Sequence, residues 1–478
     1  MQNRNVEVAI VGAGTAGMTA YRAALKHTDN LLVIESDAYG TTCARVGCMP
    51  SKLLIAAAEI SHQVERAGQF GIEVGTRRVN GRQVMQRVRD ERDRFVNAVL
   101  EDVAEWPEAH KLKGQARFMG PHELLVDGQI RVTAERIVLA VGSRPAVPEA
   151  WQVLGDRLLI SNDLFNWQQL PASVAVVGTG VIGLELGQAL ARLGVDTRLF
   201  GVNNSFGPVS DPAVREVLAQ QLATELNLAG DAPVEKVARS DDGVILTCRD
   251  SGKLREVEVD YLLAATGRRS NLDSVDLAAA GVSLDDRGMP AFNDATGQIE
   301  DSHLFIAGDA SSAHPLLHEA ADDGRIAGDN AGRFPDIRVH PRRTPLTIVF
   351  SDPQIMLTGR SHGELTRSHC RFATGEVRFE GQGRSRVLGR NTGILRVYGE
   401  HGSGQFLGAE MFGPAAEHIG HLLAWSVQQR LTVQQMLDFP YYHPVIEEGV
   451  RTALRRLNRA LQMGPVPVKD CLDCGPGA

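Results

Sequence analysis

Two copies of one glycine pattern constrain the fold of this chain more than any other feature. Residues 12–17 read Gly-Ala-Gly-Thr-Ala-Gly after the apolar run at 6–11, and residues 178–183 read Gly-Thr-Gly-Val-Ile-Gly after the run at 174–177. A helix-like segment follows each copy. Near-continuous apolar runs are typical of buried parallel strands, and a dinucleotide-binding loop lies between such a strand and a helix. The sequence therefore predicts two dinucleotide-binding βαβ units.

The three glycines of each copy have different tasks. The first allows a tight turn, the second lets the backbone approach a pyrophosphate, and the third lets helix and strand pack closely. The phosphates are then expected at the helix N-terminus, where free N–H groups and the helix dipole favour anions. The candidate dinucleotide contacts are Gly12, Gly14 and Gly17 in the first copy and Gly178, Gly180 and Gly183 in the second.

Only the first copy is followed by an acidic residue at the expected distance. Glu35 lies 18 residues after Gly17, at the end of the next apolar run, where a carboxylate accepts hydrogen bonds from a ribose hydroxyl. The corresponding position of the second copy is about Gly201, and neither an acid nor an arginine follows it at 202–204. Charge therefore does not assign the nicotinamide coenzyme as NAD or NADP. A third candidate is Asp309, which ends another apolar run directly after Gly308.

Composition excludes several other classes of protein. The six cysteines among 478 residues are too few for a disulfide scaffold. No run of about 18 apolar residues predicts a membrane-spanning helix, and the N-terminus lacks the features of a signal peptide. The net charge of −8 and the aromatic content of 5% do not favour nucleic acid as a partner. We expect a cytoplasmic protein without a membrane or nucleic-acid partner and without a bound metal.

The cysteines Cys43 and Cys48 lie close together in the sequence. Gly47 and Pro50 indicate that a helix begins near Cys48, which leaves Cys43 in the preceding bend. With that bend a disulfide is feasible, whereas one continuous helix holds the two residues too far apart. A cysteine near a helix N-terminus also has a lowered pKa. The pair therefore predicts redox chemistry.

Several motifs together resemble the flavoprotein pyridine nucleotide-disulfide oxidoreductases. They are the segment 40–52, which reads Gly-Thr-Thr-Cys-Ala-Arg-Val-Gly-Cys-Met-Pro-Ser-Lys, both glycine loops, Gly308-Asp309, Ala265-Thr266-Gly267-Arg268 and the pair His443-Pro444. Within the family, the Pro-Ser-Lys form is most similar to the dihydrolipoyl dehydrogenases. The fold implied is α/β, with two Rossmann-like domains for FAD and NAD(P) and a C-terminal α+β dimerisation domain.

The resemblance also implies roles for individual residues. Cys48 is expected to be the thiolate beside the flavin and Cys43 the thiol that exchanges with substrate, while Lys52 lies near the flavin and pairs with Glu185. FAD is expected on Glu35 and Asp309. The remaining cofactor contacts expected are Gly12, Gly14, Gly17, Gly142 and Gly308 for FAD and Gly178, Gly180, Gly183 and Gly267 for the nicotinamide coenzyme.

A second pair of expected catalytic residues stands near the C-terminus. In the family a histidine before proline and a glutamate five residues later act in the active site of the partner subunit, and here these are His443 and Glu448. A histidine held by a carboxylate moves protons between sulfur atoms near neutral pH. The resemblance therefore implies a homodimer.

The resemblance divides the chain into four parts. Residues 1–145 and 271–340 are expected to bind FAD, and 146–270 to bind NAD(P). Residues 341–465 are expected to form the dimerisation domain. The last part, 466–478, is expected to be a flexible tail with a Cys-x-x-Cys pair.

The expected reaction is the oxidation of dihydrolipoamide by NAD through FAD and the Cys43–Cys48 couple. Residues around the cysteines and the histidine depart from the usual family pattern, so other substrates stay open: a thioredoxin- or glutathione-type disulfide, or Hg(II). For these, the tail pair Cys471 and Cys474 would relay electrons. A docking subunit of a lipoyl-bearing multienzyme complex is the non-enzymatic alternative, and a lipoyl domain an alternative partner.

Overall fold

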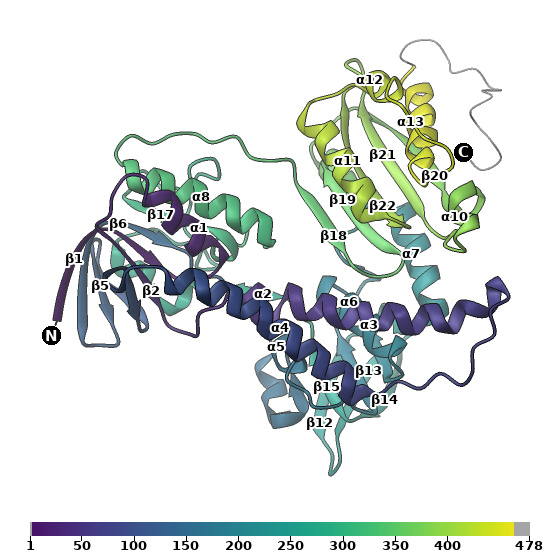
Figure 1. Cartoon of the computed structure of the whole chain (residues 1–478), viewed down its shortest axis with the longest axis horizontal. Coiled ribbons are helices and arrows are strands. Elements are labelled where there is room, and N and C mark those ends of the chain that lie inside the picture. The colour runs from purple at the N-terminus through teal and green to yellow at the C-terminus, as the bar shows by residue number, and fades with distance from the viewer. Residues whose placement is uncertain (1, 463–478) are drawn as a thin grey trace.

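The computed structural model describes residues 2–462. It contains three large sheets, each covered by helices, and the predicted α/β fold class is confirmed. In Figure 1 the N-terminal sheet lies on the left, the second sheet at the bottom and the C-terminal sheet at the upper right. None of the described helices is long and apolar enough to cross a membrane.

The N-terminal sheet is a parallel sheet with an antiparallel extension. Its central strand β1 pairs in parallel with β2 on one side and β6 on the other. The strand β6 is long enough to pair with β5 along its first half and with β17 along its second half. The strands are β1 (Gln2–Val11), β2 (Leu31–Glu35), β3 (Lys111–Lys113), β4 (Ala116–Gly120), β5 (Glu123–Val126), β6 (Ile130–Leu139) and β17 (Leu304–Ile306).

Two helices that are distant in sequence pack closely against this sheet. Helix α1 (Thr15–Ala24) follows the first glycine loop, and helix α8 (Leu317–Arg333) follows β17. A Cβ at Gly324 or Gly328 would lie 2.1 or 2.3 Å from a backbone oxygen of α1, so the two backbones nearly touch. This contact joins residues 317–333 to the N-terminal unit.

The second sheet repeats the parallel arrangement. Its order is β11-β10-β9-β15-β8, and helix α6 (Val181–Arg192) follows the second glycine loop. A three-stranded antiparallel sheet, β12-β13-β14, completes this part. The strands are β8 (Leu158–Leu159), β9 (Ser173–Val177), β10 (Asp196–Phe200), β11 (Asn227–Ala229), β12 (Val234–Arg239), β13 (Val244–Asp250), β14 (Lys253–Val259) and β15 (Tyr261–Ala264), and helix α7 is Pro212–Glu225.

The C-terminal sheet is antiparallel, with the order β18-β19-β22-β21-β20. Helices α11 (Ala416–Gln428) and α13 (Glu448–Leu461) pack on it and share a buried apolar core with its strands. The other elements are β18 (Leu346–Val349), β19 (Gln354–Gly359), β20 (Phe372–Arg378), β21 (Ile394–Glu400), β22 (Phe406–Gly413), α9 (His362–Arg367), α10 (Gly383–Val387) and α12 (Val433–Leu437).

Two long helices and one small sheet connect the parts. Helices α3 (Cys48–Arg66) and α4 (Gly81–Ala104) lie side by side across the middle of the molecule (Figure 1). Strands β7 (Ser143–Pro145) and β16 (Arg268–Ser270) pair where the chain passes between the first two parts. The four domain limits given above stay predictions.

Candidate active site

The first glycine loop has the shape that a bound dinucleotide needs. Gly12 has φ +107°, and a Cβ there would lie 2.3 Å from the Ala140 carbonyl oxygen, so only glycine fits. A Cβ at Gly17 would lie 1.8 Å from the Gly12 oxygen, which places helix α1 directly against the turn. At Gly14, by contrast, no other atom lies within 4 Å of the Cβ position. The loop is therefore tightly packed at Gly12 and Gly17 and open at Gly14, where a pyrophosphate would lie.

The second loop has the same construction. Gly178 has φ +113°, and a Cβ there would lie 2.2 Å from the Ala265 oxygen, whereas the space beside Gly180 is open. The sheet registers are also equivalent, since Val11 pairs with Ile34 in one sheet and Val177 with Phe200 in the other. Each loop thus lies at the carboxyl edge of a parallel sheet, where ligands bind in open α/β folds.

Glu35 lies beside the first loop, as the sequence predicts. Its Oε2 accepts a hydrogen bond of 2.7 Å from the Ala13 N–H, and its Oε1 accepts one of 2.8 Å from the Asp37 N–H. The carboxylate is therefore fixed at the end of β2, next to the space in front of Gly14. This position suits a ribose hydroxyl as a hydrogen-bond donor.

Cys43 and Cys48 lie on two successive helices rather than on a bend and a helix. Cys43 belongs to the short helix α2 (Thr42–Val46), and Cys48 is the first residue of α3. The hydroxyl of Thr41 caps α2 by accepting a hydrogen bond of 3.2 Å from the Ala44 N–H. Gly47 has non-helical φ and ψ and separates the two helices. The bend expected before Cys48 is therefore limited to Gly47. Residues 42–46 form a helix instead, because the hydroxyl of Thr41 caps its N-terminus.

Both thiols are free, and each shifts the pKa of the other. The Cys43 thiol donates a hydrogen bond to the Cys48 sulfur, and together with the positive charge of Lys52 this lowers the pKa of Cys48 to about 7. The same hydrogen bond, with burial, raises the pKa of Cys43 well above its ordinary value. Near neutral pH Cys48 is therefore the sulfur that ionises, while Cys43 stays a protonated thiol.

Lys52 links the cysteine helix to the second dinucleotide unit. Its Nζ lies 2.7 Å from Oε2 of Glu185 on α6, and it also lies 4.8 Å from the centre of the Phe350 ring. Glu185 is only 4% exposed, and its Oε1 accepts a hydrogen bond of 2.9 Å from the Phe350 N–H. The predicted Lys52–Glu185 pair is present, while the role of Phe350 as a third partner was not anticipated. No sequence signal marked it, because it lies 165 residues after Glu185.

Asp309 belongs to a small polar cluster that the sequence only partly revealed. Its Oδ2 accepts a hydrogen bond of 2.6 Å from the Ser143 hydroxyl, which in turn accepts one of 2.8 Å from Arg268 Nε. Burial lowers the pKa of Arg268, while Asp309 and Cys48 act on it in the opposite direction. Arg268 thus lies within electrostatic range of the cysteines. The motif at 265–268 contains Arg268, but the resemblance predicts a cofactor contact only for Gly267 of that motif.

The expected glycines Gly142, Gly267 and Gly308 all have positive φ. The space at the Cβ positions of Gly142 and Gly267 is open, whereas Gly308 packs against Ala16 and Ala320. Gly142 and Gly308 follow the neighbouring strands β6 and β17, at the same sheet edge as the first loop. Their backbone therefore borders the proposed FAD site, and Gly267 borders the second loop.

His443 and Glu448 form a hydrogen-bonded pair in the C-terminal part. His443 Nδ1 lies 3.0 Å from Oε1 of Glu448, whose Oε2 accepts a hydrogen bond from the Val445 N–H. Glu448 is 3% exposed, whereas the side chain of His443 is 67% exposed. Within residues 2–462 of one chain, His443 makes no hydrogen bond or ion pair with Cys43 or Cys48. The structure therefore brings together the two members of this pair, but not the histidine and the cysteines.

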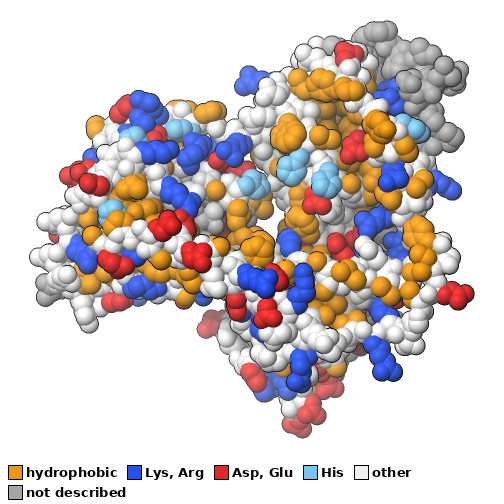
Figure 2. Space-filling model, viewed as in Figure 1, with side chains coloured by type: hydrophobic (Ala, Val, Ile, Leu, Met, Phe, Trp, Pro, Cys, Tyr) orange, Lys and Arg blue, Asp and Glu red, His pale blue; other side chains and the backbone are white. Residues whose placement is uncertain are grey.

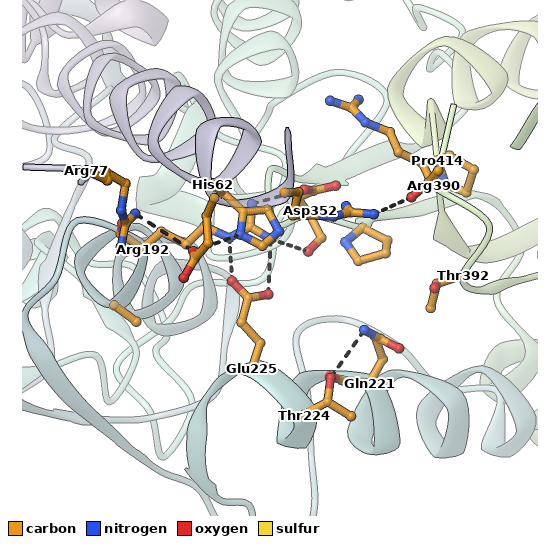
Figure 3. Close-up of a pocket in the computed structure, with 15 residues that line it drawn as sticks. His62, Arg77, Arg192, Gln221, Thr224, Glu225, Asp352, Arg390, Thr392 and Pro414 are labelled. Atoms are coloured by element: carbon orange, nitrogen blue, oxygen red, sulfur yellow. Dashed lines mark hydrogen bonds and ion pairs between the residues drawn. The ribbon is translucent and has the colours of Figure 1, made fainter. Parts of the chain in front are cut away.

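A separate polar cavity of about 570 Å³ lies where helices α3, α6 and α7 meet the C-terminal part (Figure 3). Arg192, 5% exposed, reaches into it and pairs with Glu225 and with Asp352 at 3.0 Å. Burial, followed by the positive charge of Arg192, lowers the pKa of the neighbouring His62. Arg192, Glu225 and Asp352 thus pair with one another and join α6 and α7 to the C-terminal part. Neither Cys43 nor Cys48 lines this cavity.

The residues present fit FAD at the first loop. The open space at Gly14, the fixed carboxylate of Glu35 and the partly exposed Asp309 lie along one sheet edge. Backbone N–H groups at the start of α1 would hold the pyrophosphate, and the two carboxylates would accept hydrogen bonds from sugar and ribityl hydroxyls. The second loop offers the same phosphate site without an acid at the end of β10.

Comparisons with known proteins agree with this arrangement. The family of pyridine nucleotide-disulphide oxidoreductases matches residues 6–324, and its dimerisation domain matches residues 346–454. A dihydrolipoyl dehydrogenase of Haloferax volcanii is 28% identical over 462 residues, which cover 94% of this chain and 95% of that protein. A mercuric reductase of Shigella flexneri is 29% identical over 467 residues, which cover 95% and 81%.

Solved structures share the fold. LpdA from Mycobacterium tuberculosis has a TM-score of 0.80 and 23% identity, covering 96% of this chain and all of that one. The Cu(II) complex of the HOCl-induced flavoprotein disulfide reductase RclA from Escherichia coli has a TM-score of 0.79 and 21% identity, covering 97% of this chain and all of that one.

The fold and the paired cysteines define a flavoprotein oxidoreductase that acts on sulfur groups. The chain belongs to the pyridine nucleotide-disulphide oxidoreductase family, whose members use FAD and NAD(P). The resemblance seen in the sequence is confirmed, and the dimerisation domain supports a homodimer.

Proposed function

We propose that this protein oxidises a small dithiol of the dihydrolipoamide type with NAD, through a reversible disulfide between Cys43 and Cys48. The balanced reaction converts the dithiol and NAD⁺ into a cyclic disulfide, NADH and one proton. FAD, when bound, passes the electron pair between the sulfur atoms and the nicotinamide. Relatives named dihydrolipoyl dehydrogenase at 27–29% identity support this choice of substrate.

The separation of the two thiol pKa values carries the proposal. In the oxidised pair, a substrate thiolate attacks the Cys43 sulfur, the disulfide breaks, and Cys48 leaves as a thiolate. A thiol with a low pKa leaves faster, and the pKa of Cys48 is lowered to about 7. The second substrate thiolate then attacks the substrate sulfur of the mixed disulfide, which forms the product disulfide and releases Cys43 as the leaving group. Cys43, whose pKa is raised, takes up a proton at this step.

This scheme needs a base that accepts protons from the substrate thiols. We assign this role to His443 of a second copy, with Glu448 as the residue that orients its ring. The exposed position of His443 and the family's dimerisation domain favour this assignment. Apolar side chains also gather on the C-terminal part (Figure 2), and Leu422 and Trp425 on α11 are 44% and 63% exposed. Such a surface suits a symmetric contact between two copies.

The test is turnover by the purified holoprotein with each coenzyme and each sulfur substrate. We expect dihydrolipoamide with NAD⁺ to give a rate at least about tenfold above those with glutathione, thioredoxin or lipoamide-free controls. Cys48→Ser should abolish this turnover. Cys248→Ser changes a buried cysteine on β13 and should leave the turnover intact. Undiminished turnover by Cys48→Ser would contradict the mechanism, and faster turnover of another substrate would replace dihydrolipoamide.

A second candidate function is the reduction of a metal ion such as Hg(II) by two electrons from a nicotinamide coenzyme. Relatives named mercuric reductase, 25–29% identical to this chain, favour it. The tail pair Cys471 and Cys474, which this function would use as a relay, lies outside the described residues. Loss of Hg(II) reduction but not of dithiol oxidation in a Cys471→Ser, Cys474→Ser variant would support the relay. Equal activities of the variant and the original protein would rule it out.

A further inference from the structure

The second dinucleotide unit has no room for an acid at the position equivalent to Glu35. The register of the two sheets makes Gly201 that equivalent, since it directly follows Phe200 as Glu35 follows Ile34. A Cβ at Gly201 would lie 2.7 Å from Thr179 Oγ1 and 2.9 Å from the Gly230 oxygen. The residue is buried, and its neighbours close the space that a longer side chain would need.

A carboxylate reaches the same edge from the adjacent strand. Asp231 follows the end of β11, which pairs in parallel with β10. Its Oδ1 accepts a hydrogen bond of 2.8 Å from the Asn203 N–H in the loop after β10. The backbones of the two loops are also joined, because the Gly201 N–H donates to the Ala229 oxygen and the Ala232 N–H donates to the Gly201 oxygen, both at 2.9 Å.

This carboxylate is exposed and available to a ligand. Across residues 2–462, Asp231 makes no ion pair, and Oδ1 is the side-chain oxygen that accepts a hydrogen bond. The two loops contain no lysine or arginine between residues 201 and 206 or between 229 and 234. The edge therefore carries one free negative oxygen and no cation from either loop.

We propose that Asp231 binds the adenosine ribose hydroxyls of the nicotinamide coenzyme in place of the missing acid and thereby selects NAD over NADP. A carboxylate accepts hydrogen bonds from both hydroxyls of a ribose. The 2′-phosphate of NADP would instead bring a second negative group to an edge where neither loop contains a lysine or an arginine. This assignment rests on the proposed function in so far as the second loop binds a nicotinamide dinucleotide.

The experiment measures binding of two redox-inactive fragments, ADP-ribose and its 2′-phosphate, to the FAD-loaded protein by calorimetry. We expect the protein to bind ADP-ribose at least about tenfold more tightly than the 2′-phosphate. Asp231→Asn keeps the Oδ1 acceptor for Asn203 but removes the charge. It should weaken ADP-ribose binding and lower the ratio of the two affinities by about tenfold.

Matched variants separate this effect from a general loss of structure. Asp241→Asn removes an exposed charge at the other end of β12 and should leave the ratio unchanged. Asp231→Glu should restore part of the preference. An unchanged ratio in Asp231→Asn would overturn the assignment while leaving the proposed oxidation intact. A preference of the original protein for the 2′-phosphate would overturn the assignment and the choice of NAD, but not the oxidation of the dithiol. Failure of both NADH and NADPH to reduce the bound FAD would instead overturn the proposed function, and this assignment with it.

Discussion

Lys52 and Glu185 form a 2.7 Å ion pair that joins the helix of the redox cysteines to the helix of the second dinucleotide loop. The carboxylate is almost completely buried and also holds the backbone of Phe350 at the start of the C-terminal part. One side-chain pair thus connects three parts of the chain. It also places a positive charge near Cys48, where it lowers the pKa of that thiol.

The pair is expected to contribute to stability because one partner is buried. Lys52→Met should lower the free energy of unfolding by about 2–3 kcal/mol, since it leaves the Glu185 carboxylate without its cation. The double variant Lys52→Met, Glu185→Gln should recover part of this loss. Denaturant unfolding of the original protein, Lys52→Met, Glu185→Gln and the double variant gives the coupling energy of the pair. Strictly additive losses of stability would contradict a direct interaction.

The thiolate of Cys48 should titrate near neutral pH. Because its pKa is lowered from the ordinary 9.0 to about 7, the thiolate predominates above pH 7 and the unreactive thiol below it. The rate of alkylation of Cys48 in the reduced protein, followed by mass spectrometry of its peptide, should therefore rise through pH 7. In Cys43→Ala the midpoint should move upward by about one pH unit, because the hydrogen-bond donor is lost. Cys370→Ser serves as the control and should not move the midpoint.

The proposed proton-transfer pair should affect turnover without affecting reduction of the bound FAD by NADH. His443→Gln should lower dithiol oxidation by about 100-fold, because general acid–base catalysis is lost. Glu448→Gln should give a smaller loss, since the ring keeps a hydrogen-bond acceptor. His401→Gln changes an exposed histidine in the turn after β21 and should leave the rate unchanged. Equal rates for His443→Gln and the original protein would exclude His443 as the base.

Alanine variants in the two glycine loops should distinguish the glycines needed for packing from those needed for ligand binding. Gly14→Ala and Gly180→Ala place a methyl group in open space and should leave the thermal stability of the protein without added ligand nearly unchanged. Gly14→Ala should weaken FAD binding, whereas Gly180→Ala should keep FAD and weaken NADH binding by about tenfold or more. Gly12→Ala should instead destabilise the fold itself, because its Cβ meets a backbone oxygen at 2.3 Å. Fluorescence titration with each cofactor distinguishes these outcomes.

The cavity of Figure 3 offers a test of the contact between α6 and the C-terminal part. Arg192→Ala should lower the free energy of unfolding by about 3 kcal/mol, because Glu225 and Asp352 lose their shared partner. Arg390→Ala, at an exposed arginine that lines the same cavity, should cost less than about 0.5 kcal/mol. Equal losses in the two variants, measured by denaturant unfolding, would show that the buried network has no special role.

Most of the local structure followed from the sequence. The patterns predicted a helix after each glycine loop, and the structure has α1 at Thr15–Ala24 and α6 at Val181–Arg192. Both glycine loops and the Glu35 position follow from short-range spacing, because one strand, one turn and one helix fix them. The short helix around Cys43 was missed, since its Thr41 cap is a single hydroxyl in an otherwise irregular segment.

The sequence by itself determined the two dinucleotide units, the paired cysteines and the family, because each depends on residues within a few positions of one another. Only the tertiary structure decided which distant groups meet. It placed Glu185 against Lys52 and Phe350, Ser143 between Asp309 and Arg268, and Asp231 beside the closed position of Gly201. These contacts join strands and helices that are separated by up to 166 residues along the chain, and no periodicity or motif spacing encodes them. They arise when neighbouring sheets and helices pack, and packing fixes both the charge around Cys48 and the acid available at the second loop.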